Sequence, residues 1–185
     1  MRSIVIGQYL LILCCAFYLI WWYCGFRPGI SVGRVGGING ILLLITAVLG
    51  VAGIFFSLMS VPEVIKPKTS PRAIVVIGIL TYLVLLLITR YGFQRIVTTE
   101  LILIVGWTTL EMTVINRLYA GGFLSGQEFV VMCAVIAAAF LISMVLYVAY
   151  YWMEEMKAFY AAMVPLITEG ASMAVLVGML LTGGR

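Results

Sequence analysis

The stretch YAAMVPLITEGASMAVLVGMLL, residues Tyr160–Leu181, is apolar along almost its whole length. As a helix it would measure about 33 Å, which is enough to cross the hydrocarbon core of a bilayer, roughly 30 Å thick. Glu169 breaks the pattern near the middle of the stretch. A carboxylate at the bilayer centre costs several kcal/mol and is normally retained for a pathway, a relay or a buried partner. The stretch therefore predicts a transmembrane helix that carries a polar site.

Apolar stretches of similar length recur along the rest of the chain. They predict six spans, over residues 3–24, 38–59, 73–89, 96–118, 129–152 and 158–181. The fourth is rich in Thr and Glu, so a bundle of five spans is the alternative. We expect an all-α, polytopic integral membrane protein in which residues 1–185 form a single transmembrane helical domain.

The overall composition agrees with this class. Of the 185 residues 64% are apolar and only 10% are charged, whereas about 25% are charged in ordinary soluble domains. The formal charge of +4 is spread over short loops. A nucleic-acid surface would need a basic stripe, so no nucleic-acid partner is expected. The same charges suit contact with the headgroups of membrane lipids.

The residue types that the chain lacks narrow its chemistry. It contains neither His nor Asp, which removes the usual general base, His-based zinc and haem sites, and paired-Asp chemistry. The four cysteines lie in or beside apolar segments, without CxxC spacing, and are expected to be small buried hydrophobes: Cys14, Cys15, Cys24 and Cys133. We therefore expect no metal, no cofactor and no catalytic residues, and an enzyme is the less favoured class.

Six spans place both termini on one side of the membrane. The polar segment Pro62–Arg72, with three prolines, is expected to be an extended connector on that same side. The terminal side holds six Lys and Arg residues and the other side five, a weak positive-inside signal. It favours cytoplasmic termini in a multi-pass protein of the cell (plasma) membrane.

The fourth span carries a polar stripe. Glu100 and Glu111 are eleven residues apart, which places them within about 20° of the same helix face and roughly 16 Å apart along the axis. Trp107 and Thr108 lie on or beside this stripe. Such a face should point away from lipid, towards a cavity, a cation or proton path, or an Arg on another span. For Glu100, a position at the membrane edge near the positive end of the helix dipole is the favoured alternative.

The surroundings of Glu169 strengthen its candidacy. Pro165 lies one turn before it and should kink or loosen the helix, while Gly170 follows it directly. Interrupted helices of this kind expose backbone carbonyls to cations in the middle of the membrane. The alternative is a buried acid, protonated or hydrogen-bonded to a neighbouring helix.

Other polar and small residues are expected to join helices. Gln8 in the first span should find a partner on another helix. Small-residue faces on the second, fifth and sixth spans should permit close packing, within one chain or between protomers: Gly50, Gly53 and Ser57; Ala134 to Ala139; Gly170 and Ala174.

Three functions fit these features. The favoured one is a small transporter or channel-type protein for a small-molecule or cation substrate, with an intramembrane polar site formed by Glu169, Glu111, Trp107, Thr108 and Asn116. The second is a non-catalytic membrane subunit or scaffold that binds a partner subunit or a second copy of itself. The third is a membrane-embedded enzyme acting on a lipid. A water-filled cavity that reaches the glutamates would favour transport, and a tightly packed interior would favour the subunit.

Overall fold

The structure, a computed structural model, describes residues 2–28, 36–59, 70–94 and 99–182. Within these ranges it is helical, and six helices are long and apolar enough to cross a membrane. The elements are α1 (Arg2–Phe26), α2 (Gly36–Met59), α3 (Pro71–Leu87), α4 (Thr99–Ala120), α5 (Gly126–Tyr150), α6 (Glu155–Ala161) and α7 (Val164–Thr182). A π-helical turn, Ile88–Gly92, extends α3. The all-α polytopic fold is confirmed, and the alternative of five spans is wrong.

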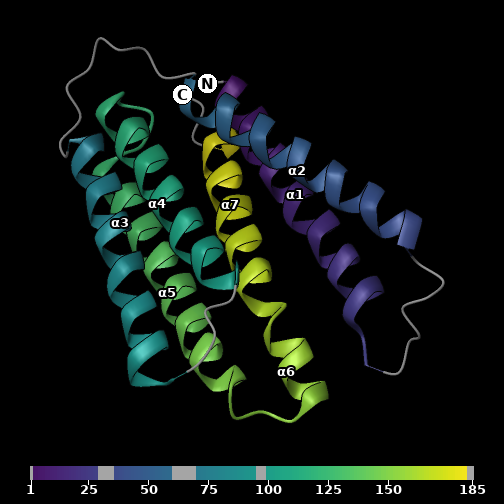
Figure 1. Ribbon diagram of the computed structural model, residues 1–185. Helices are drawn as coiled ribbons and strands as arrows, with labels where there is room; N and C mark the ends of the chain where they lie inside the picture. The colour runs from purple at the N-terminus through teal and green to yellow at the C-terminus, as the bar shows by residue number, and fades with distance from the viewer. Residues whose placement is uncertain (1, 29–35, 60–69, 95–98, 183–185) are drawn as a thin grey trace.

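The bundle has α7 in the middle (Figure 1). Helices α1 and α2 form a pair on one side of it, and α3, α4 and α5 form a group on the other. Of the six spans, α4 is the most buried, although it is the least apolar, and α2 and α3 are the least buried. The polar stripe of α4 therefore lies inside the protein, while the uniformly apolar helices present their side chains to lipid.

Three boundaries differ from those expected. Pro71 and Arg72 belong to the first turn of α3 rather than to a connector. Proline is tolerated in a first turn because backbone N–H groups there have no hydrogen-bond partner within the helix. Helix α5 begins at Gly126 because Ser125 and Glu128 form a capping box. Glu155 to Lys157, which lie between the expected spans 129–152 and 158–181, form the start of α6. Residues 60–69, which make up most of the expected Pro62–Arg72 connector, lie outside the described residues, as do 29–35.

The sixth span is interrupted where the sequence predicted a kink. Helix α6 ends at Ala161 and α7 begins at Val164, so Pro165 occupies the first turn of a new helix. There its missing N–H costs no hydrogen bond. The Ile167 amide still donates to the carbonyl of Met163, at 3.2 Å. The break places Glu169 about one turn inside a separate helix.

The contact between α1 and α2 is close because glycines line both helices. A Cβ atom added to Gly7 would lie 2.6 Å from the amide nitrogen of Ser57 and 2.9 Å from the carbonyl oxygen of Gly53. A Cβ on Gly53 would in turn lie 2.7 Å from the side chain of Leu11. The small-residue face predicted for the second span is therefore confirmed, and Gly7 is the partner that the sequence did not indicate.

Both ends of the described chain lie at the same end of the bundle (Figure 1). We expect single cysteines at Ser3 and Ser70, in a Cys-free background, to react with an impermeant maleimide from the same side of sealed membranes. A cysteine at Met153, in the turn between α5 and α6, should react only from the other side. Labelling of Ser70 and Met153 from one side would contradict the six-span topology.

Candidate functional site

Two buried carboxylates lie in the interior of the bundle, near the middle of the helices that carry them. Glu111 on α4 has none of its surface exposed, and Glu169 on α7 has 1% exposed. Each is within about 3 Å of the midpoint of its span, Thr99–Ala120 or Glu155–Thr182, measured along the helix axis. A charge at this depth has no access to water or to lipid headgroups. These two residues are therefore the centre of the candidate site.

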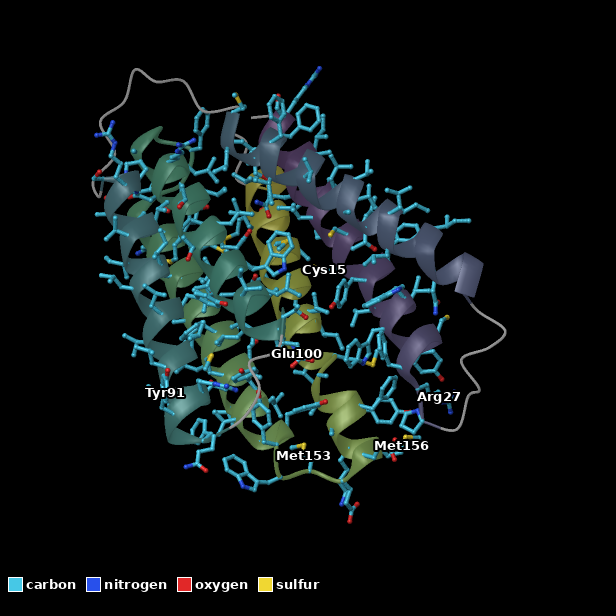
Figure 2. The ribbon with its side chains drawn as sticks, viewed as in Figure 1. Cys15, Arg27, Tyr91, Glu100, Met153 and Met156 are labelled. Atoms are coloured by element: carbon cyan, nitrogen blue, oxygen red, sulfur yellow. The ribbon has the colours of Figure 1, made fainter. Side chains whose placement is uncertain are left out.

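The fold brings the two carboxylates near each other. Helix α4 packs against α7, and the two side chains are close enough for their charges to interact. Cys15 on α1 interacts with both carboxylates and lies where α1 faces α7 (Figure 2). A Cβ on Gly170, directly after Glu169, would lie 3.7 Å from the Cβ of Cys15, an ordinary van der Waals contact, so α1 and α7 lie close together here. Three helices thus meet at the site.

Each carboxylate has a polar neighbour on another helix. The amide of Gln8 on α1 is close to Glu111, and the hydroxyl of Thr108 on α4 is close to Glu169. Gln8 Nε2 also donates to Ser57 Oγ on α2, at 3.5 Å. The Thr108 hydroxyl donates to the carbonyl of Ile104, at 2.8 Å, so only its oxygen lone pairs remain for the site. The polar groups therefore continue from the glutamates towards α1 and α2.

Neither carboxylate forms a hydrogen bond with another described residue. All four carboxyl oxygens of Glu111 and Glu169 are buried without such a partner, and so is Gln8 Oε1. No ion pair involves them in the described part of the chain, where Lys157 and Glu154 pair at 2.9 Å on the exposed surface. Two neighbouring negative charges in an apolar interior are strongly unfavourable. To compensate this charge, the pair therefore requires a bound proton, or a cation that the described residues do not supply.

Trp107 and Asn116 face other parts of the bundle. Trp107 precedes Glu111 by one turn on α4, yet it lines an apolar groove between α2 and α3. Asn116 lines a second cavity, of about 330 Å³, between α3, α4 and α5. Of the five residues expected at the site, Glu169, Glu111 and Thr108 lie close together. Asn116 shares the second cavity with Thr108, and neither glutamate lines that cavity.

Glu100 lies at the end of α4 that is farther from the termini, inward of Tyr91, Met153 and Met156 (Figure 2). It is in the first turn of α4 and interacts with Tyr18 of α1 and Tyr150 of α5. Its place in the first turn of α4 agrees with the expected position near the positive end of the helix dipole. Glu100 therefore lies apart from the central pair.

Sequence reasoning treated three residues near the site as structural. Cys15 was expected to be a small hydrophobe, Gln8 a residue that joins helices, and Ser57 part of a packing face. For Gln8 the expectation is confirmed, because its amide donates to Ser57 on α2, and it also lies close to Glu111. Nothing local in the sequence distinguishes Cys15 from Cys14, since its role depends on which helix α1 faces.

The site is closed in this conformation. Glu111 and Glu169 are almost completely buried and line neither the apolar groove nor the cavities between α3, α4 and α5, although Thr108 lines one of those cavities. Those residues also contain no group of three or more His, Cys, Asp or Glu side chains placed to hold a metal. Comparison with known proteins finds no family model, no curated protein and no solved structure that matches the chain.

Proposed function

We propose that this multi-pass membrane protein is a small transporter in which Glu111 and Glu169 form an intramembrane proton or cation site. One observation carries the proposal. Two buried carboxylates from different helices lie near the middle of their spans, close enough for their charges to interact, without a cationic or hydrogen-bonding partner among the described residues. Ionisable residues held at such depth are costly, and exchange of a proton or cation is what they are normally retained for.

The interruption of the sixth span supports the same proposal. Glu169 follows the α6–α7 break by about one turn, and α7 contacts α1, α4 and α5. Because no continuous hydrogen-bond ladder joins α7 to α6, the angle between the two helices can change at the break, within the limits set by the packing of α7 against its neighbours. Tilting of α7 would open the closed site to one side and would carry Glu169 with it.

A specific observation favours the second candidate function, a non-catalytic membrane subunit. The glutamates are closed off and no described cavity reaches them, which is the arrangement expected of a packed interior. In that case the pair would hold a shared proton and would join α4 to α7. The embedded-enzyme hypothesis has no comparable support.

Ion flux separates the two candidates. The purified chain is reconstituted into vesicles that contain a pH-sensitive and a potential-sensitive dye, and gradients of Na⁺, K⁺ or choline are imposed in turn. We expect a Na⁺ or K⁺ gradient to drive proton or charge movement that choline does not drive. Flux equal to that of protein-free vesicles for every gradient would contradict transport and leave the subunit as the function.

A further inference from the structure

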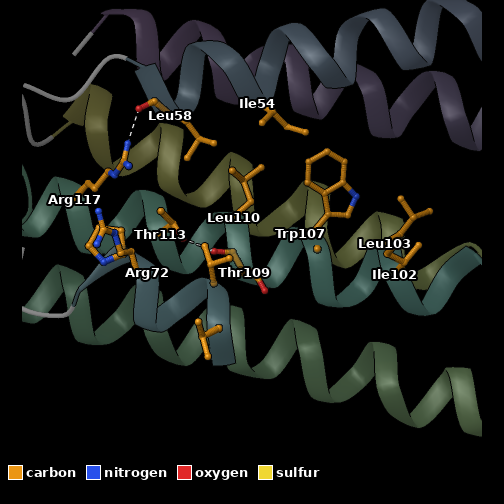
Figure 3. A pocket seen from close by; sticks show the side chains of 14 residues that line it. Ile54, Leu58, Arg72, Ile102, Leu103, Trp107, Thr109, Leu110, Thr113 and Arg117 are labelled. Carbon is orange, nitrogen blue, oxygen red and sulfur yellow. Dashed lines mark hydrogen bonds between the residues drawn. The ribbon is translucent and has the colours of Figure 1, made fainter. Parts of the chain in front are cut away.

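An open groove crosses one face of the bundle, away from the buried glutamates. Helices α2 and α3 form its walls and α4 forms its floor (Figure 3). Its volume is about 800 Å³, within the range of roughly 300 to 1,000 Å³ that is usual for small-molecule sites. The gap exists because α2 pairs with α1 and α3 pairs with α4, while α2 and α4 hardly touch.

The floor and walls of the groove are almost entirely apolar. Ile102, Val75 and Val76 are about half exposed, so they present hydrocarbon to whatever occupies the groove. Gly106 lies in the floor, and a Cβ atom added there would meet nothing within 4 Å. A groove of this kind, open along a membrane-facing surface, accepts an acyl chain without desolvating polar groups.

Two arginines lie at one end of the groove (Figure 3). Arg117 is in the last turn of α4 and Arg72 is in the first turn of α3. Arg117 Nη1 donates to the carbonyl of Leu58 near the end of α2, at 2.5 Å, and its other N–H groups remain for a ligand. Among the described residues neither arginine forms an ion pair. The end of the groove is therefore positively charged, at the level of the membrane where headgroups lie.

The length of the groove matches a lipid that is anchored at the two arginines. Trp107 lies about 15 Å from Arg117 along α4, which is half of the roughly 30 Å hydrocarbon core, or one leaflet. Guanidinium groups bind phosphate oxygens through paired N–H donors. The charged end of the groove would thus bind the headgroup phosphate, while the apolar floor contacts the acyl chain of the same lipid.

We propose that this groove is a binding site for one anionic glycerophospholipid, with its phosphate at Arg72 and Arg117 and an acyl chain along α4. The charge complementarity at one end distinguishes this occupant from a second copy of the chain or an apolar partner helix, neither of which needs two cations. The site is independent of the glutamate pair, so evidence against lipid binding here would not count against the transport proposal.

Lipid binding can be measured by native mass spectrometry of the full chain, delipidated and then titrated with dioleoyl phosphatidylglycerol or dioleoyl phosphatidylcholine. We expect a preference for phosphatidylglycerol. Arg72→Gln and Arg117→Gln should each reduce it about fivefold, because a basic residue near the membrane surface contributes about that factor. Arg2→Gln is the matched control, since Arg2 is exposed at the same end of the bundle, and it should leave the preference unchanged.

A second pair of variants tests the acyl-chain part of the site. Gly106→Leu should fill the floor of the groove and remove tight binding of either lipid without lowering the melting temperature. Gly178→Leu, at an exposed glycine on α7 that also has open space around it, should bind lipid as the wild type does. Equal binding of both lipids by the wild type, or full binding by Gly106→Leu, would overturn the proposal. A wild-type dimer that forms without lipid and that Gly106→Leu dissociates would also overturn the proposal.

Discussion

Glu169→Gln is expected to lower cation-driven flux about 100-fold or more, because loss of an interaction with a charged group of about 3 kcal/mol corresponds to two powers of ten. Gln keeps the size and hydrogen-bonding atoms of Glu but cannot ionise or exchange a proton. Removing one of two neighbouring carboxylates from an apolar interior should leave the melting temperature unchanged or raise it. Flux and melting are measured on the same preparation.

The other carboxylate provides an internal check. Glu111→Gln should cause a loss of flux similar to that of Glu169→Gln, and the double variant should lose little more than either one, because residues that act as a unit are not additive. Glu155→Gln is the control, since Glu155 is exposed at the start of α6, and it should retain full flux. Full activity of Glu169→Gln would refute the ionisable site and favour the subunit function.

Gly7→Ala is expected to cause the largest loss of folded protein among single-methyl changes. The added Cβ would lie against the backbone of α2, 2.6 Å from the Ser57 amide nitrogen, and backbone atoms cannot move aside as a flexible side chain can. Forced overpacking of this kind costs about 1–3 kcal/mol or more. We expect a lower melting temperature and a smaller monodisperse peak in size-exclusion chromatography.

Gly40→Ala is the matched control for this prediction. Gly40 is also a helical glycine, on α2, but a Cβ there would meet nothing within 4 Å. Since Ala is favoured over Gly in a helix by about 1 kcal/mol, Gly40→Ala should be neutral or stabilising. Equal melting temperatures for the two variants would mean that the close contact between α1 and α2 does not limit stability.

The sequence identified the helices because each is governed by local chemistry. A run of about twenty apolar residues must span a bilayer as a helix, since no other backbone arrangement in one segment satisfies its own hydrogen bonds there. Pro165 likewise predicted the interruption of the sixth span, because a proline in a helix interior removes a hydrogen bond. The boundaries at Pro71 and Gly126 were missed, although each follows from a cap or first-turn proline that the sequence contains.

The candidate site was predictable only in part. Glu111 and Glu169 were evident from the sequence, because a carboxylate in an apolar run is unfavourable wherever the helix packs. Thr108, expected beside the polar stripe of α4, lies close to Glu169 on α7. Asn116 was grouped with the pair on polarity alone, and the structure directs it towards α3 and α5 instead.

The sequence by itself determined that this chain is a multi-pass helical membrane protein, with six spans favoured over five, and that two carboxylates lie within its apolar stretches. Hydropathy and helix length decide both, and neither depends on a neighbouring helix. Only the tertiary structure decided that Glu111 and Glu169 are close enough for their charges to interact, that Gln8 and Cys15 are near enough to affect them, and that Arg72 and Arg117 share one end of an apolar groove. These facts depend on which helices pack together, and that is set by contacts between residues far apart in the chain, such as Gly7 with Ser57.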